Sequence, residues 1–144
     1  MRQALLALTI AFGVTLVANA ADAPKLEGIK CPVSQKPVAA DHHVDHKEGH
    51  VYFCCPNCPK AFKANTEKFA AKANQQLFAT GQFKQVACPF SGQPVKEHAE
   101  GNNAPGFCCE NCLGKYNKAD EAAQLEMVFA DKPFAKGFEA KEAE

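Results

Sequence analysis

The chain has 144 residues, of which 47% are hydrophobic and 22% are charged, and it contains eight cysteines and no tryptophan. Its 16 basic and 16 acidic residues balance, so the composition gives no support to nucleic-acid binding, which needs a concentrated basic face. After the first twenty residues, no segment is apolar for the roughly 20 residues that a membrane span requires.

The first twenty residues have the pattern of an export signal. Arg2 precedes an apolar run over 5–17, and the tripeptide Ala-Asn-Ala at 18–20 forms an A-x-A cleavage site. The apolar run is too short for a membrane span, although an uncleaved N-terminal anchor is the alternative. We therefore expect a periplasmic or secreted protein with a signal peptide at 1–20 that is cleaved after Ala20.

The remainder of the chain contains one pattern twice. IKCPVSQKPV at 29–38 recurs as VACPFSGQPV at 86–95, and FCCPNC at 53–58 recurs as FCCENC at 107–112. Each copy thus has one cysteine followed, some twenty residues later, by a cluster of three. The agreement at so many offsets indicates a tandem duplication.

We therefore expect two small units, a first over 21–82 and a second over 83–138, followed by a short charged tail over 139–144 that is frayed. Units of about 50 residues bury little apolar surface and usually need a metal or disulfides to hold them together. Four cysteines in each unit suit that need.

In the first unit, a short apolar strand at about 27–30 leads into Cys31 and a proline-bounded turn. HHVDHK and VYFCC then flank the turn EGH, which predicts a hairpin. One helix is expected to begin at the CxxC, over CPKAFKAN, and a second covers TEKFAAKANQQLFA and ends before Gly81. Helical spacing places four side chains of these helices in the core: Phe62, Phe69, Ala73 and Leu77.

The second unit repeats this order with weaker signals. A strand at about 84–87 leads into Cys88, and KEHAE and PGFCC flank the loop GNNA, where Pro105 weakens the second strand. Helices are expected over CLGKYNKA and over DEAAQLEMVFA, the latter capped by Asp120. The sequence thus predicts an α+β protein of two tandem units, each with a cysteine turn, a β-hairpin and two helices.

The cysteines are compatible with three chemistries. Thiolates bind Zn²⁺ and Cu⁺, and a cysteine pair around a tight turn can converge on one ion with a distant cysteine. An even number of cysteines in an exported protein also suits disulfides, for example Cys31–Cys54 with Cys55–Cys58. A CxxC at a helix start is the arrangement of thiol redox proteins as well, although those place it after a βαβ unit that this chain lacks.

The cysteine segments resemble a known family. CPVSQKPV, VYFCCPNCPKAF and NTEKF in the first copy, with CPFSGQPV and GFCCENCLGKY in the second, are similar to YHS domains and to the related TRASH domains of heavy-metal trafficking, resistance and sensing. The resemblance covers nearly the whole chain after the signal. It implies treble-clef-like units that each bind one transition or heavy metal ion. Zinc and copper are the first candidates, because thiolates bind these ions. The family positions fall on Cys31, Cys54, Cys58, Cys88, Cys108 and Cys112.

The fourth ligand is left open by this comparison. Where the family often has a second cysteine near the first, this chain has Ser34 and Ser91, and it has an extra thiol directly after the family's second position. Adjacent cysteines rarely both reach one ion, because their side chains diverge. The candidates for completing the two shells are Cys55, Cys109, His46, His50 and His98.

Histidines are concentrated ahead of the first cluster, in DHHVDHKEGH. Strand alternation predicts His42, Val44 and His46 on one face of the hairpin and His43 with Asp45 on the other. Most of these histidines are expected to be solvated, and a weaker surface metal site in the first unit is the alternative.

Taken together, these features predict an exported, non-enzymatic protein that binds a metal ion for sequestration, trafficking or structural stabilisation. The sequence contains neither a serine–histidine–aspartate set nor a phosphate-binding loop that would indicate an enzyme. It does not identify a protein partner. Two alternatives stay open: a disulfide-stapled interaction module without metal, and a CxxC thiol redox protein.

Overall fold

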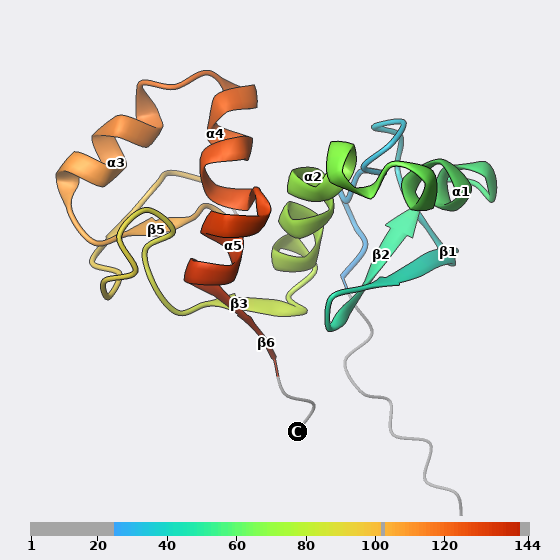
Figure 1. Cartoon of the computed structure of the whole chain (residues 1–144), viewed down its shortest axis with the longest axis horizontal. Helices are drawn as coiled ribbons and strands as arrows, with labels where there is room; N and C mark the ends of the chain where they lie inside the picture. The colour runs from blue at the N-terminus through green and yellow to red at the C-terminus, as the bar shows by residue number, and fades with distance from the viewer. Residues whose placement is uncertain (1–24, 102, 142–144) are drawn as a thin grey trace, which may run out of the picture.

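The computed structural model describes residues 25–101 and 103–141, so the signal peptide predicted for 1–20 lies outside the described residues. Within these ranges the chain is α+β, as predicted, with five helices and small antiparallel sheets (Figure 1). None of the described helices is both long and apolar enough to cross a membrane.

The first copy contains the predicted hairpin and two helices. The hairpin pairs strand β1 (Ala39–His46) with strand β2 (Gly49–Phe53). Helix α1 (Asn57–Ala64) starts inside the cysteine cluster, and helix α2 (Thr66–Ala79) follows with the bounds that the sequence predicted. Gly81, at φ +74°, takes the left-handed conformation that lets the chain leave α2 and turn away.

The hairpin of the second copy is much shorter. Strands β4 (Glu97–His98) and β5 (Gly106–Phe107) pair over two residues each. Pro105 stands immediately before β5 and has no N–H with which to extend the ladder. The predicted weakening of this strand is therefore confirmed.

The helices of the second copy follow the expected order. Helix α3 (Glu110–Asn117) begins at the cysteine cluster, and helix α4 (Glu121–Phe129) comes after it. The predicted cap is confirmed, because the Asp120 carboxylate accepts a hydrogen bond from the N–H of Ala123 at 2.9 Å.

Two elements near the C-terminal end were not predicted. Helix α5 (Asp131–Gly137) is a short segment with Pro133 in its first turn, where the missing N–H would have had no partner in the helix. Strand β6 (Phe138–Ala140) pairs antiparallel with strand β3 (Phe83–Gln85).

The tail predicted to fray from residue 139 onward is therefore partly held in a sheet. Glu139 and Ala140 belong to β6, and the N–H of Lys141 donates to the Gln82 carbonyl at 2.9 Å. Three-residue strands bear too little alternation to be recognised in sequence, and this one forms because its partner β3 lies at the start of the second copy.

The two copies pack on each other through α2, which lies against α4 and α5 (Figure 1). An aromatic cluster joins them: the ring of Phe78 on α2 is 6.1 Å from that of Phe129 and 5.0 Å from that of Phe138. Asn74 is fully buried at the same boundary, and its amide donates to the Phe129 carbonyl at 2.8 Å and to the Asp131 carboxylate at 3.1 Å. A single hydrophobic cluster consequently runs through both copies.

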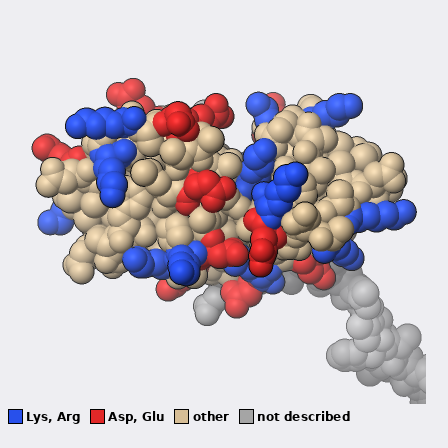
Figure 2. All heavy atoms as spheres, turned by 45° about the horizontal axis from the view of Figure 1, so that its top comes forward, with Lys and Arg blue, Asp and Glu red and all other residues tan. Residues whose placement is uncertain are grey.

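The core residues predicted from helical spacing lie in this cluster. Phe62, Ala73 and Leu77 are buried, and Phe69 is partly buried against them. On the face shown in Figure 2, basic and acidic side chains are interspersed rather than gathered by sign.

Candidate metal centres

Each lone cysteine begins a tight turn that fixes its position. The N–H of Cys31 donates to the Lys36 carbonyl at 2.8 Å, and its carbonyl accepts from the N–H of Gln35 at 2.9 Å. Cys88 makes the same pair of bonds within its own turn, at 2.9 and 2.8 Å. Both cysteines have an exposed fraction of 0%, so each copy places one thiol at the bottom of its site.

Two further cysteines of the first copy converge on Cys31. Cys54 follows directly on β2, and Cys58 lies in the first turn of α1. The Sγ atoms of the three residues all lie within 4.8 Å of one another, and those of Cys54 and Cys58 are 3.6 Å apart. Sulfurs that surround zinc tetrahedrally at about 2.3 Å are about 3.8 Å apart, so this trio is close enough to hold a metal ion.

The second copy builds the same arrangement. The Sγ atoms of Cys88, Cys108 and Cys112 also lie within 4.8 Å of one another, with 3.7 Å between Cys108 and Cys112. Among the described residues, these two trios are the groups of three or more cysteine, histidine or acidic side chains spaced for a metal ion. The six cysteines that the sequence pattern indicated are thus brought together, three in each copy.

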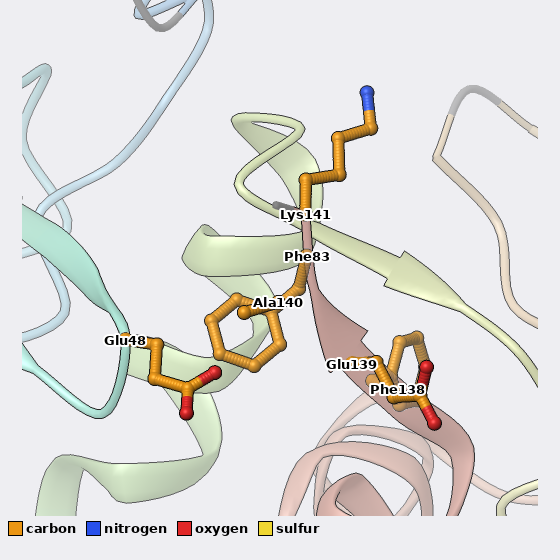
Figure 3. Close-up of a pocket in the computed structure, with 6 residues that line it drawn as sticks. All are labelled: Glu48, Phe83, Phe138, Glu139, Ala140 and Lys141. Atoms are coloured by element: carbon orange, nitrogen blue, oxygen red, sulfur yellow. The ribbon is translucent and has the colours of Figure 1, made fainter. Parts of the chain in front are cut away.

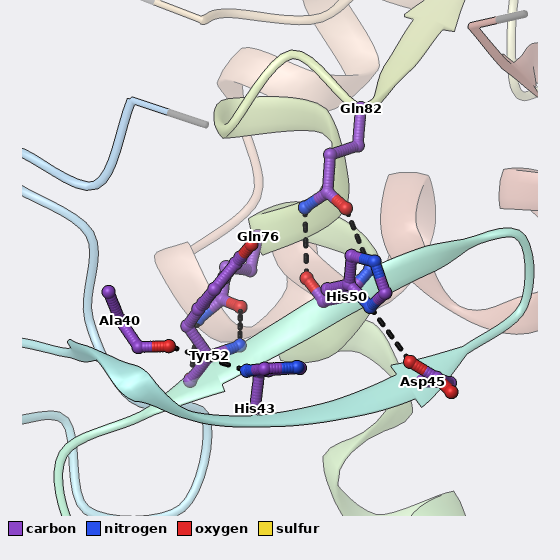
Figure 4. A network of polar contacts seen from close by, with 7 residues as sticks. All are labelled: Ala40, His43, Asp45, His50, Tyr52, Gln76 and Gln82. Atoms are coloured by element: carbon purple, nitrogen blue, oxygen red, sulfur yellow. Dashed lines mark hydrogen bonds and ion pairs between the residues drawn. The ribbon is translucent and has the colours of Figure 1, made fainter. Parts of the chain in front are cut away.

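The strand that leads to the first cluster is held by two glutamine side chains (Figure 4). Gln76 on α2 bonds the N–H and the carbonyl of Tyr52 at 2.6 and 3.0 Å, and Gln82 bonds those of His50 at 2.6 and 2.9 Å. Tyr52 stands two residues before Cys54, so these amides fix the backbone that presents its thiol.

The second copy uses a different glutamine for the same task. Gln85 on β3 bonds the N–H and the carbonyl of Gly106 at 2.6 and 2.7 Å, two residues before Cys108. Sequence reasoning missed these positioning residues. Their offsets from the clusters differ between the copies, so the repeat could not reveal them.

Two serines, Ser34 and Ser91, lie beside the trios. The Ser34 hydroxyl is 3.0 Å from the Cys54 sulfur, and the Ser91 hydroxyl donates to the Cys108 sulfur at 3.1 Å. Each hydroxyl also accepts from the backbone N–H two residues on, at 3.5 and 3.2 Å respectively. Each trio thus has a serine hydroxyl next to the sulfur of its strand-end cysteine, Cys54 or Cys108.

The pKa values of the two buried thiols, Cys31 and Cys88, are lowered towards neutral pH. Burial raises the pKa of Cys31, but hydrogen bonds from the Ser34 hydroxyl and from the backbone N–H groups of Ser34, Cys54 and Val33 outweigh it and bring the pKa to about 7. The same balance of burial against hydrogen bonds, mainly from Ser91, brings the pKa of Cys88 to about 7. Each site therefore contains a thiolate near neutral pH.

The pKa values of the two thiols on the helices, Cys58 on α1 and Cys112 on α3, are raised instead of lowered. Burial, hydrogen bonds to the neighbouring sulfurs and the charge of the buried cysteine raise the pKa of Cys58 and of Cys112 to about 12. Each is a protonated thiol beside a thiolate. A metal ion that binds the trio must therefore displace at least this proton.

Metal affinity should consequently rise with pH, because protons compete with the ion for the thiolates. Binding displaces the Cys58 proton throughout and a second proton from Cys31 below pH 7. Each displaced proton changes the apparent affinity by about tenfold per pH unit. We therefore expect the affinity to rise by at least about tenfold per pH unit above pH 7 and by at least about a hundredfold per pH unit below it. Competition against a zinc chelator of known proton affinity measures this, and a flat profile would contradict it.

The remaining two thiols lie on the outer side of the trios. The Cys55 sulfur is partly exposed and lies 3.5 Å from that of Cys58, while the exposed Cys109 sulfur lies 3.7 Å from that of Cys108. Backbone N–H groups, first that of Cys58 and first that of Cys112, lower the pKa of the Cys55 and Cys109 thiols respectively. All eight cysteines are free thiols.

The candidate histidines have other surroundings. The half-buried ring of His46 packs edge-on against Phe62, with 5.4 Å between centroids, and burial followed by the charge of Lys47 lowers its pKa. His50 bonds the Asp45 carboxylate at 2.8 Å on the hairpin surface (Figure 4). His98 lies on β4, and none of the three belongs to a metal-spaced group of the described residues.

The predicted alternation of the hairpin is confirmed. His42, Val44 and His46 are half-buried, whereas His43 and Asp45 are exposed. The rings of His43 and His50 lie 5.3 Å apart on the exposed side.

A hollow of about 470 Å³ lies apart from both trios, beside the β3–β6 ribbon (Figure 3). Its lining contains no cysteine or histidine and consists of Glu48, Phe83, Phe138, Glu139, Ala140 and Lys141. The thiol chemistry of the chain is therefore confined to the two cysteine clusters.

Comparisons of the chain with family models, with curated proteins and with solved structures found no match. Inference about function therefore rests on the two cysteine trios, their burial and their neighbours.

Proposed function

We propose that this protein binds one thiophilic metal ion in each copy of the repeat, without enzymatic activity, for sequestration, trafficking or structural stabilisation. The observation that carries the proposal is that one three-sulfur group is built twice, from the same turn, strand end and helix start. The proposed ligands are Cys31, Cys54 and Cys58 in the first site and Cys88, Cys108 and Cys112 in the second.

The donor set indicates the class of ion. Thiolates favour Zn²⁺, Cu⁺ and other soft or borderline ions over Mg²⁺ or Ca²⁺, which prefer oxygen. Three thiolates with a hydroxyl beside them leave one coordination position for another ligand, in contrast to closed structural zinc sites with four protein ligands. Zinc or copper is therefore the first candidate for each site.

The proposal also covers the type of fold of the two units and the export of the protein. Each unit has a cysteine turn, a hairpin and a helix that starts at the three-cysteine cluster, which is consistent with treble-clef-like units of the YHS or TRASH type. The N-terminal signal would export the protein. The two alternatives, a disulfide-stapled module and a CxxC redox protein, both require Cys55 or Cys109 to be oxidised with a neighbour. They differ from the proposal in metal content and in the number of free thiols.

Site-directed variants test the proposal by metal stoichiometry. The protein is expected to bind two Zn²⁺, Cys58→Ser and Cys112→Ser one each, and the double variant none, because each substitution removes one thiolate from one trio. The matched control is Lys60→Ser, an exposed position on the same helix as Cys58, and it should retain two. Equilibrium dialysis with elemental analysis provides the count, and two ions bound by the double variant would contradict the proposed ligands.

A fourth thiol should tighten both sites. Ser34 and Ser91 already touch a trio sulfur, so Ser34→Cys and Ser91→Cys should convert each three-thiolate site into a four-thiolate one of the kind that zinc occupies in structural sites. We expect zinc affinity to rise by about a hundredfold, which corresponds to about 2.7 kcal/mol. Competition against a chromophoric chelator measures the change. Unchanged affinity would mean that the serines do not face the ion.

A further inference from the structure

Each cysteine cluster runs from a buried to an exposed thiol. In the first copy, Cys31 has an exposed fraction of 0% and Cys58 of 7%, while Cys55 is partly exposed. In the second copy, Cys88 is at 0% and Cys109 is exposed. Of the other proposed ligands, Cys54, Cys108 and Cys112 are partly exposed. The solvent-accessible end of each cluster thus contains a trio thiol together with the outer thiol, Cys55 or Cys109.

The outer thiol contacts the trio in both copies, but at a different sulfur. Cys55 lies 3.5 Å from Cys58, whereas Cys109 lies 3.7 Å from Cys108. These two trio members are not equivalent, because Cys58 is on the helix and Cys108 follows the strand. One backbone pattern therefore accommodates two positions of the outer side chain, each within reach of a trio sulfur.

The adjacent pairs restrict what the outer thiol can do at equilibrium. Cys54 and Cys55 are consecutive, as are Cys108 and Cys109. In each pair it is the first cysteine that belongs to the metal-spaced trio. The fourth side of that trio is next to a serine hydroxyl, which binds soft ions weakly compared with a thiolate.

We propose that Cys55 and Cys109 are exchange ligands, through which a thiophilic ion passes between each trio and a donor or acceptor that carries the ion on its own thiolates. This inference rests on the proposed metal binding. Among the proposed roles it selects trafficking, because it requires the protein to transfer its ions rather than hold them permanently. The partner class is a thiol protein or a thiol peptide that can approach the exposed end of the cluster.

The exchange involves no change in oxidation state. On entry, the outer thiol loses its proton and forms a metal–sulfur bond as one bond from the ion to the donor thiolate breaks. The ion then forms bonds to the trio, whose thiols release their protons to water, and the bond to the outer sulfur breaks. The released donor thiolate and the outer thiolate take up protons, so sulfur, metal and charge are all conserved.

The test compares equilibrium binding with the rate of transfer. The Zn²⁺-loaded protein, the Cys55→Ser/Cys109→Ser variant and the Cys54→Ser/Cys108→Ser variant are each mixed with excess synthetic Cys-x-x-Cys peptide, and ion transfer is followed by native mass spectrometry. We expect the outer variant to bind two ions with affinity within about twofold of the original and to transfer them at least about tenfold more slowly, a factor equivalent to about 1.4 kcal/mol of barrier. The trio variant should instead lose affinity.

Each outcome has one reading. Transfer by the outer variant at the original rate would overturn the inference and leave the proposed function intact. A loss of affinity as large as that of the trio variant would show Cys55 and Cys109 to be equilibrium ligands, which also overturns it. Failure of the original protein to bind zinc would overturn both proposals. The single Cys109→Ser variant, at an exposed position, repeats the rate measurement where folding does not depend on the substituted side chain.

Discussion

Removing the metal from both trios is expected to lower the melting temperature of the protein by roughly 20 °C. An ion present at about a hundred times its Kd stabilises the folded state by about 2.7 kcal/mol, so two ions contribute about 5 kcal/mol. A domain of this size shifts by about 4 °C for each kcal/mol. The change is large because the total stability of a small domain is only about 5–15 kcal/mol.

The structural reason for this effect lies in what the ions connect. Cys31 and Cys88 belong to turns held by two backbone hydrogen bonds each, and the second hairpin has only two residues in each strand. Metal–sulfur bonds would tie each turn to the strand end and the helix start. Without them, three buried or half-buried thiols face one another with few other bonds.

Differential scanning calorimetry of the loaded protein with and without a chelator measures this shift. The control is the Cys58→Ser/Cys112→Ser variant, whose melting temperature the chelator should leave unchanged. A melting curve of the original protein that is indifferent to the chelator would show that metal binding does not contribute to folding.

The second large effect is expected from Phe129→Ala, which should destabilise the loaded protein by about 3–5 kcal/mol. Phe129 has an exposed fraction of 3%, and its ring lies 6.1 Å from that of Phe78 and 5.6 Å from that of Phe138. Truncation would leave a cavity at the boundary where α2 of the first copy meets α4 and α5 of the second.

Urea unfolding measures this loss of stability and also tests whether the two copies unfold together. Since one hydrophobic cluster spans both copies, we expect a single transition for the original protein. The matched control is Phe69→Ala, a partly exposed phenylalanine on α2, which should cost less. Two separate transitions in the original protein, with only one affected by Phe129→Ala, would contradict a shared core.

The parts of the fold that were predictable are those with strong local signals. The 14 residues of α2 carry a clear helical pattern of buried side chains, and Asp120 is a strong cap. The first hairpin was predictable because the segments HHVDHK and VYFCC flank the turn EGH.

The unpredicted parts depend on tertiary contacts. α5 and β6 are short, and β6 exists because β3 pairs with it from more than fifty positions earlier in the chain. The packing of α2 against α4 and the burial of Asn74 likewise join residues far apart in sequence. Each copy read alone contains no signal for these contacts.

The two metal centres were also predictable only where the sequence carries a local signal. The repeat and the family resemblance indicated six cysteines, and the structure brings them together in two trios. Sequence reasoning left open which of the two adjacent thiols joins each trio, and the geometry favours Cys54 and Cys108. It did not foresee the contacts of Ser34 and Ser91 with trio sulfurs, because hydroxyl groups are not expected ligands of a soft ion.

Metal binding by the two trios is tested by counting metal ions and free thiols together in protein purified from the compartment to which the proposed signal peptide would direct it. We expect about two thiophilic ions per chain, and we expect the thiols of the trios to react with alkylating agents only after a chelator has removed the ions. Protein that contains no metal and whose cysteines are all oxidised to disulfides would contradict it.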